Sequence, residues 1–181
     1  MQSFPDASAL LAPRSLDDLL MYRMWRAVRE SNGMVTRMVE GGFGITHREW
    51  GMIGALTQLG EVTSSELAKR LLLDRVSTSR GLRSLGDKKL LERRQDAEDG
   101  REVRVRLSQS GQELCGALFP RIASFNVDLL AAIDAAHMDV FLECLRRLEL
   151  RGSELKAQGV VAEKADRRSG GTRHRWPRHG A

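Results

Sequence analysis

The chain has 181 residues, 41% hydrophobic and 29% charged, which suits one compact domain with appendages. No run of 18 apolar residues occurs, and the N-terminus lacks the basic start and apolar block of a secretory signal, so we expect no membrane span and a cytoplasmic location. The net charge of +5 is uneven, because residues 69–106 carry +5 and residues 160–181 carry +4. A basic stripe of this kind is typical of a phosphate-binding surface, although a solvated charged face has the same composition.

The first part of the chain predicts a flexible N-terminus, residues 1–14, followed by one long helix over about 16–40. The helix is indicated by apolar residues at helical spacing: Leu16, Leu20, Met24, Ala27, Met34 and Met38. Gly41, Gly42 and Gly44 follow and predict its end, because glycine readily adopts the left-handed conformation of a helix stop.

Three short helices come next, each with a start signal. Thr46 precedes Glu49 by three residues, and Thr63 precedes Glu66 in the same way, which predicts two capping boxes. Asp74 is a suitable N-cap for a third helix over about 75–89. Three capped helices in about 45 residues, joined by tight turns, indicate a helix-turn-helix.

The segment after these helices predicts a β-hairpin. Residues 90–95 can form a short strand, residues 96–100 a polar turn, and residues 101–107 alternate, with Val103, Val105 and Leu107 on one face. Ser108 or Ser110 then caps a helix that runs to about 133, with Ser110 and Glu113 as a third capping box, and Asp134 starts a last helix. Residues 160–181 predict a disordered basic tail. The predicted fold class is mainly α with a small β-hairpin wing (α+β).

This order of elements resembles the MarR family of winged helix-turn-helix transcriptional regulators. The resemblance rests on four stretches: Gly44–Thr46 with Trp50, Ser65–Ala68, Leu85 ahead of Leu90–Arg93, and Asp99–Gly111. The sequence departs from the family at Lys89, where a glycine is usual, and at Gly81 inside the third helix. The resemblance implies a MarR-like domain over 15–159, with a winged helix-turn-helix over about 45–109 and dimerisation helices over about 16–40 and 110–157.

The resemblance also implies that helix 75–89 enters the major groove of double-stranded DNA, where arginine can pair with guanine. The expected DNA-binding residues are Ser64, Ser65, Arg75, Ser77, Ser79, Arg80, Arg83, Arg94, Asp99 and Arg101. Arg101 is expected to enter the minor groove, oriented by Asp99, unless the two side chains only pair across the turn. Arg93, Arg104 and Arg106 are expected to contact the backbone of the DNA, or to be solvated.

Family likeness further implies a homodimer that reads a palindromic operator, the alternative being an internal helical bundle in a monomer. We expect a repressor released by a small ligand, an aromatic carboxylate, with five residues lining its site: Tyr22, Arg23, Trp25, Arg26 and Trp50. Alternatively, Trp50 lies in the core and the arginines face solvent or an interface.

Other classes of function have less support. The chain lacks HExxH, GxSxG, P-loop and GxGxxG patterns, so we expect no enzyme, no catalytic residues, no metal site and no cofactor. Cys115 and Cys144 are expected to be reduced thiols, with a redox-responsive regulator as the alternative. A winged-helix module that binds proteins instead of DNA stays open, but exposed arginines on the helix and wing argue against it.

Overall fold

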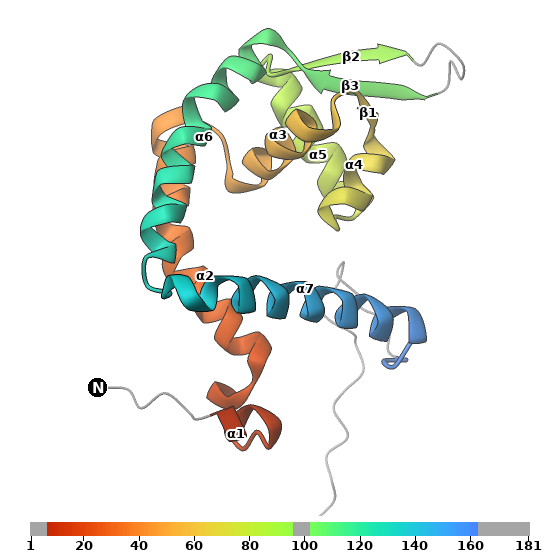
Figure 1. Ribbon diagram of the computed structural model, residues 1–181. Coiled ribbons are helices and arrows are strands. Elements are labelled where there is room, and N and C mark those ends of the chain that lie inside the picture. Colours follow the sequence, from red (N-terminus) through yellow and green to blue (C-terminus); the bar gives the residue numbers. More distant parts are fainter. Residues whose placement is uncertain (1–6, 96–101, 163–181) are drawn as a thin grey trace, which may run out of the picture. The chain divides into compact units, whose positions relative to one another are not determined.

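The computed structural model describes residues 7–95 and 102–162, which form helices and one small antiparallel sheet (Figure 1). The chain divides into two compact units, Met1–Leu130 and Ala131–Ala181. The first unit contains the sheet and the short helices, and the described residues of the second, up to 162, contain one long helix. The predicted fold class, mainly α with a small β wing, is confirmed. The predicted tail, 160–181, lies almost wholly outside the described residues.

The N-terminal part is less continuous than predicted. Ala7–Leu11 form a short helix, α1, inside the segment expected to be flexible. A single helix over 16–40 is wrong: a 3-10 turn, η1 (Leu16–Asp18), precedes α2 (Leu20–Thr36), and α2 continues into a π-helical stretch, η2 (Arg37–Gly41). The carboxylate of Asp18 accepts the amides of Arg14 and Ser15, at 2.9 and 2.8 Å, and so closes a separate turn. Gly44, with φ +65°, ends the helical segment as expected.

All three helix starts of the helix-turn-helix are confirmed. The Thr46 hydroxyl accepts the Glu49 amide at 3.2 Å, and the Glu49 carboxylate accepts the Thr46 amide at 2.6 Å. Thr63 and Glu66 make the same pair of bonds at 3.2 and 2.7 Å. Asp74 accepts the amide of Ser77 at 2.7 Å. These caps start α3 (His47–Leu59), α4 (Ser64–Leu71) and α5 (Arg75–Asp87).

The wing consists of β2 (Leu91–Gln95) and β3 (Val103–Leu107), and a third strand, β1 (Val62–Thr63), completes the sheet in the order β1-β3-β2. In the antiparallel register Arg93 lies opposite Val105, and Leu91 lies opposite Leu107. Val105 and Leu107 are buried, but Val103 is exposed, so the apolar face predicted for this strand points inward over only part of its length.

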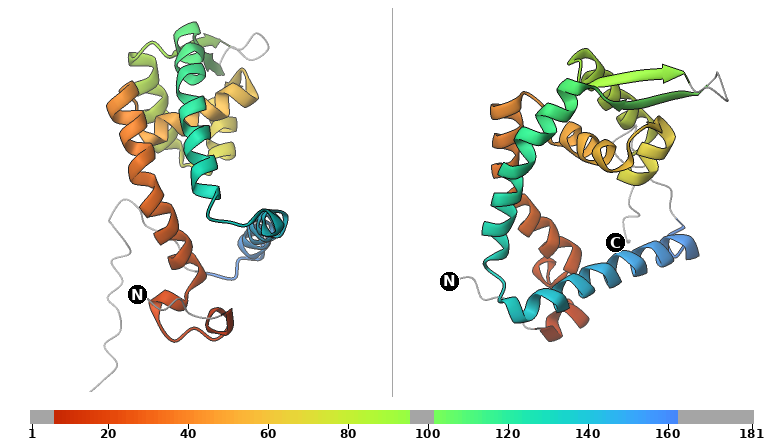
Figure 2. Two further views of the ribbon diagram at one scale, coloured as in Figure 1. Left: turned by 60° about the vertical axis from the view of Figure 1, so that its left-hand side comes forward. Right: turned by 45° about the horizontal axis from the view of Figure 1, so that its top comes forward.

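Two long helices follow the sheet. α6 (Gln109–Leu130) leaves the end of β3 and runs past α3 (Figure 2). Ser108 caps it, since its hydroxyl accepts the Gly111 amide at 3.1 Å. The predicted box between Ser110 and Glu113 is wrong, because Ser110 lies inside the helix and Glu113 accepts from the Gln109 side chain at 2.9 Å. α7 (Ala135–Gln158) ends at Gly159, with φ +62°.

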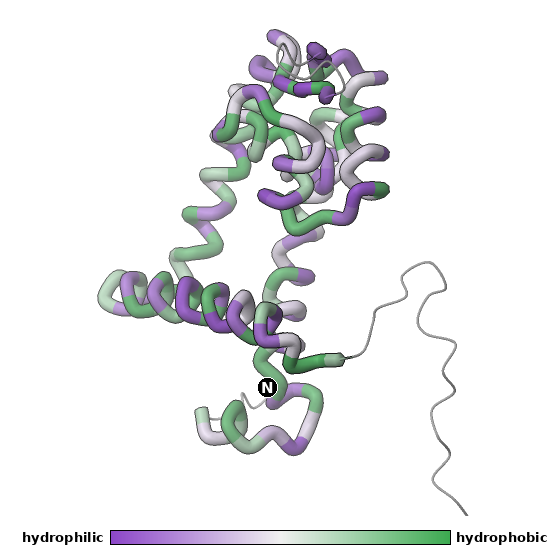
Figure 3. Tube along the Cα trace, turned by 90° about the vertical axis from the view of Figure 1, so that its right-hand side faces the viewer, coloured by the Kyte–Doolittle hydropathy of each residue, from purple (hydrophilic) through white to green (hydrophobic). Residues whose placement is uncertain are grey.

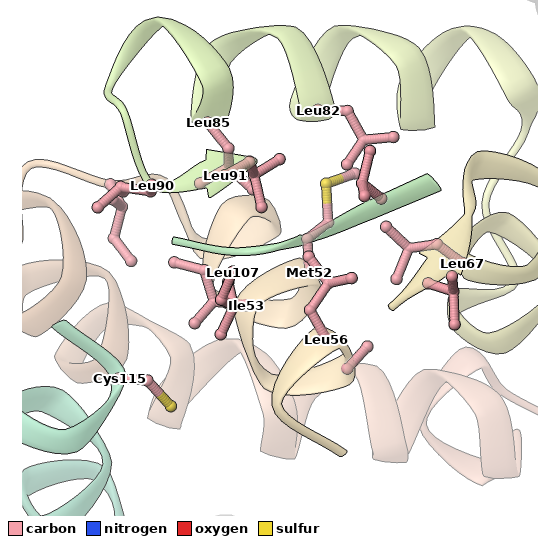
Figure 4. Packing of buried hydrophobic residues seen from close by; sticks show 14 of the residues in the cluster. Met52, Ile53, Leu56, Leu67, Leu82, Leu85, Leu90, Leu91, Leu107 and Cys115 are labelled. Atoms are coloured by element: carbon pink, nitrogen blue, oxygen red, sulfur yellow. The ribbon is translucent and has the colours of Figure 1, made fainter. Parts of the chain in front are cut away.

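A cluster of buried apolar residues joins the short helices to the sheet (Figure 4). α3 supplies Met52, Ile53 and Leu56, and these pack between α4, α5 and β3. Gly81 is explained by this packing, because a Cβ there would lie 2.5 Å from the Met52 methyl carbon. The glycine therefore lets α5 lie directly against Met52, which offsets its low helix propensity.

Lys89, where the family usually has a glycine, lies in a backbone conformation that favours glycine. Lys89 takes the left-handed conformation, with φ +60°, directly after α5. The Lys89 amide donates to the Gly86 carbonyl and the Leu90 amide to the Leu85 carbonyl, both at 2.9 Å, so the carbonyls at the end of the helix are satisfied. A lysine thus occupies the position where glycine is free of steric cost, and the helix still ends there.

Candidate nucleic-acid interface

A surface hollow of about 370 Å³ lies where α4, α5 and the wing strands meet. Its rim and walls are formed by Ser64, Ser65, Arg75, Thr78, Ser79, Leu82, Arg93, Val103 and Val105. Two helices, α4 and α5, therefore bring four of the residues expected to bind DNA to one place: Ser64, Ser65, Arg75 and Ser79. We call this the α4–α5–wing hollow.

The capping box at Thr63 determines how the first residues of α4 are presented. Because the Thr63 hydroxyl accepts the Glu66 amide, Ser64 and Ser65 form the exposed first turn of the helix. The amides of a helix's first residues have no carbonyl partner within the helix and carry a partial positive charge. Hydroxyls and amides at this end of α4 are therefore suited to an anion.

The exposed face of α5 carries most of the expected base-contacting residues. Arg75, Ser79, Arg80 and Arg83 are exposed, and the first two also line the hollow. Ser77 differs, because its hydroxyl donates to Asp74 at 2.9 Å and so belongs to the N-cap of the helix. α5 thus exposes three arginines to solvent: Arg75, Arg80 and Arg83.

The wing separates its arginines between two faces. Side chains alternate along a strand, so Arg93 shares a face with buried Leu91 and lines the hollow, whereas Arg94 lies on the other face. From the sequence, Arg94 was placed among the DNA-binding residues, and Arg93 was expected to contact the DNA backbone or to be solvated. The burial of Leu91, two residues earlier, was the signal that could have placed Arg93 toward α5. Arg94 stays a predicted DNA contact, but it does not line the hollow.

The other wing residues have different surroundings. Arg106 pairs with Glu92 on the neighbouring strand, at 2.7 Å, in an exposed ion pair. Arg104 is only partly exposed and lies opposite Arg94. Asp99 and Arg101, expected at the tip of the wing, lie outside the described residues, so their proposed contact with the minor groove stays a prediction.

The far end of α5 is held by an ion pair that the sequence did not reveal. Lys88 donates to the Glu49 carboxylate and to the Gly44 carbonyl, both at 2.8 Å. Burial raises the pKa of Glu49, but hydrogen bonds from Lys88, Ser84 and the Thr46 amide outweigh that cost and leave the pKa below its ordinary value. Glu49 therefore caps α3 and also fixes the end of α5, the helix that carries the arginines.

The expected ligand-binding residues are not gathered around one cavity. Tyr22 and Trp25 stack along α2, with ring centroids 5.6 Å apart, and Arg26 pairs with Asp17 at 2.9 Å. Trp50 is half-buried and borders a second hollow of about 950 Å³ between α3, α6 and β3. Neither the aromatic pair nor Arg23 and Arg26 contribute to the lining of that hollow.

The two cysteines are free thiols in contrasting surroundings. Cys115 is buried on α6, with its sulfur 3.3 Å from the Thr57 hydroxyl, and Cys144 is exposed on α7. Residues 7–95 and 102–162 contain no cluster of three or more potential metal ligands. In the same ranges no single helix is long and apolar enough to cross a membrane; only α6 and α7 taken together, as a bent pair, have the necessary length and composition.

Residues 43–102, the segment that contains α3, α4, α5 and the wing, match the model of the MarR family. This segment is similar to the winged helix-turn-helix of the MarR family. An uncharacterized HTH-type transcriptional regulator of Bacillus subtilis, YdgJ, is 25% identical over 126 residues, which cover 70% of this chain and 77% of that protein. The MarR family resemblance inferred from the sequence is thereby confirmed.

Solved structures share the MarR fold. A MarR/EmrR family transcriptional regulator from Acinetobacter sp. ADP1 is 22% identical, with a TM-score of 0.71 over 78% of this chain and 99% of that one. The MepR–DNA complex of S. aureus is 24% identical, with a TM-score of 0.67 over 74% and 98% of the two chains. The fold of this chain, with its helices and wing, is therefore similar to that of a protein whose structure was solved in complex with DNA.

Proposed function

We propose that this chain is a transcriptional regulator that binds double-stranded DNA, with α5 in the major groove and the wing beside it. The observation that carries the proposal is that Arg75, Arg80 and Arg83 are all exposed on α5, with Arg75 in the hollow that the wing strands also line. An α-helix fits the major groove, and arginine forms paired hydrogen bonds with guanine. The fold shared with MepR, which was solved with DNA, supports the same orientation.

Substitution of Arg80 tests this function most directly, because Arg80 is exposed on α5 and lies outside the lining of the α4–α5–wing hollow. We expect Arg80→Ala to weaken binding to a specific duplex by about tenfold or more, the loss of one base-reading arginine. Gel-shift titration against the upstream region of the protein's own gene, at fixed salt, measures it. Arg48→Ala, an exposed arginine in the first turn of α3, is the matched control and should bind like the parent. A parent protein that binds no duplex even at low salt would contradict the function.

We also propose that the regulator is a homodimer that reads a palindromic operator. α7 has no buried residue, although polar and apolar residues alternate along it (Figure 3) and Val140, Leu142 and Leu148 are exposed. Apolar side chains on a long helix are stabilised when a second copy covers them. Sedimentation velocity should show a dimer at micromolar concentration; a monomer throughout that range would contradict this part of the proposal.

The second hollow supports a binding site for an effector, which we propose to be an aromatic carboxylate. Trp50, Phe119 and Pro120 offer apolar contacts. Arg106, which pairs with Glu92 in the free protein, offers a cation when the effector's carboxylate takes the place of Glu92. An effector that binds there releases the DNA and so relieves repression. Of the five residues expected from the sequence to bind the effector, only Trp50 lines this hollow. The proposed site therefore lies between α3, α6 and β3 and not on α2.

Thermal unfolding with benzoate and hydroxybenzoates tests this site. Ligand at a hundredfold excess over its dissociation constant should stabilise the protein by about 2.7 kcal/mol. We expect Arg106→Gln to abolish that stabilisation, while Arg26→Gln, which removes a cation of α2, should leave it unchanged. The opposite result would favour a site on α2, and no stabilisation of the parent by any of these acids would reject the effector class.

A further inference from the structure

Helix α6 contains a proline, Pro120, in its interior. In an α-helix the amide of each residue donates to the carbonyl four residues earlier, and proline has no amide hydrogen. Pro120 therefore leaves the carbonyl of Gly116 without its helical donor. The pyrrolidine ring would also clash with that carbonyl in its ideal helical position, so the oxygen turns outward. The interior of α6 thus has a backbone acceptor that the helix does not use.

This acceptor belongs to the second hollow, the one between α3, α6 and β3. Gly116 and Pro120 lie one turn apart on the same side of α6, and both line the hollow. Both residues are exposed. Gly116 has no side chain to cover its carbonyl, and a Cβ there would have no other atom within 4 Å. A small molecule in the hollow can therefore reach the carbonyl oxygen directly.

Three side chains near this carbonyl in the lining already have hydrogen-bond partners. The Thr57 hydroxyl donates to the Ile53 carbonyl at 2.9 Å, so the Cys115 thiol, 3.3 Å away, is the donor to the Thr57 oxygen. The side-chain oxygen of Gln58 accepts from Arg70 at 3.2 Å. These groups have less hydrogen-bonding capacity left for a ligand than the Gly116 carbonyl has.

Glu61 and Gln112 are further acceptors in the lining, and both differ from the Gly116 carbonyl. The charge of Glu61 adds to the larger effect of Glu92 in raising the pKa of the Arg106 guanidinium, so Glu61 lies toward the charged end of the hollow. Gln112 is an exposed, flexible side chain that would lose conformational freedom on binding a ligand. The carbonyl is held by the helix, so it offers an acceptor that is already ordered.

We propose that the Gly116 carbonyl selects effectors whose aromatic ring carries a hydrogen-bond donor, such as a hydroxyl group, in addition to the carboxylate. The inference rests on the effector site of the proposed function and narrows its ligand class. Pro120 is the residue that determines this specificity, because it frees the carbonyl. The ring hydroxyl donates to the Gly116 oxygen, while Arg106 holds the carboxylate at the other end of the molecule.

The affinity of matched acids for the full-length protein is the first measurement. By calorimetric titration, meta- and para-hydroxybenzoate are each compared with the fluorobenzoate of the same substitution pattern, since fluorine cannot donate a hydrogen bond. We expect at least one hydroxy acid to bind about fivefold more tightly than its fluoro counterpart, the usual worth of a neutral hydrogen bond. Pro120→Ala should abolish this preference, because the new amide donates to the Gly116 carbonyl. The variant should fold, since alanine favours a helix more than proline does.

A second substitution in the same lining serves as the control. Phe119→Leu reduces an apolar contact but leaves the carbonyl free, so it should weaken both acids alike and keep their ratio. A preference for the hydroxy acid that persists in Pro120→Ala and disappears in Glu61→Ala would assign the contact to Glu61 and overturn the inference. Equal affinities of the parent for hydroxy and fluoro acids would also overturn it, with the effector site left intact. Failure of every acid to bind would reject the effector site as well.

The second measurement observes the carbonyl itself by NMR. Isotopic labelling of glycine carbonyls and alanine amides selects the Gly–Ala bonds of the chain, which are 54–55, 116–117 and 180–181. The Gly116 carbonyl resonance should shift further with the hydroxy acid than with the fluoro acid. Gly54 lines the same hollow and keeps its helical donor in α3, so its carbonyl should respond alike to both acids. Equal shifts of the Gly116 carbonyl with the two acids would contradict the inference.

Discussion

Gly111→Ala is expected to lower the free energy of unfolding by about 3 kcal/mol, at the upper end of the usual cost of overpacking. A Cβ at Gly111 would lie 2.3 Å from the Leu90 carbonyl oxygen and 3.2 Å from its carbon. These are backbone atoms, and the same carbonyl accepts the Ser108 amide at 3.1 Å, so neither side can easily move. Urea denaturation measures the loss.

The control for this substitution lies one and a half turns along the same helix. Gly116 on α6 has open space where its Cβ would be, so Gly116→Ala should stabilise the helix by up to about 1 kcal/mol. Opposite signs for the two changes would show that contact, not helix propensity, decides the outcome. A loss below about 1 kcal/mol for Gly111→Ala would mean that the turn before the wing can shift away from α6.

Lys88→Met is expected to lower the free energy of unfolding at pH 7 by about 2 kcal/mol, because it leaves the buried carboxylate of Glu49 without its charged partner. The loss should depend on pH. In the parent, the pKa of Glu49 is lowered on folding, so its contribution is complete above the ordinary pKa of about 4.5 and disappears as the pH falls through the lowered value. Without Lys88, burial raises that pKa, and the carboxyl group takes up a proton at a higher pH.

The stability difference between the parent and Lys88→Met should therefore begin to narrow above pH 4.5, where the variant's carboxyl group takes up its proton, and should continue to narrow as the pH falls through the lowered pKa of the parent. Chemical denaturation at several pH values measures this convergence. Lys69→Met, the same change at an exposed lysine of α4, should stay within about 0.5 kcal/mol of the parent at every pH. A difference for Lys88→Met that is constant across pH would indicate lost packing of the lysine stem instead of an unpaired charge.

Local signals in the sequence predicted the helix-turn-helix and the wing. The capping hydrogen bonds of Thr46, Thr63 and Asp74 each join two residues that are three positions apart, so the residue types that form them can be recognised in the sequence. The alternation across β3 is equally local. The break at Leu19 was missed because the apolar period continues across it, and β1 was missed because two residues are too few to show a period.

What the sequence could not supply was contact between distant elements. Lys88 and Glu49 are 39 residues apart, and nothing in either neighbourhood indicates their partner. The face on which Arg93 lies could not be predicted for a related reason: which face of β2 meets α5 depends on packing, although buried Leu91 indicates it once the fold is known. Whether Tyr22 and Trp25 share a ligand site with Trp50 also depends on contacts between distant elements: the two rings stack on each other along α2, and neither lines the hollow that Trp50 borders.

The alternation along β3 has a mechanical consequence. Val103 and Val105 form part of one hollow, while Arg106 and Leu107 form part of the other. Val105 and Leu107 lie on the same face of β3, so one short strand contributes to both hollows at successive positions along its length. A guest that tilts this strand in one hollow also moves part of the lining of the other, so the occupancy of the two is mechanically coupled.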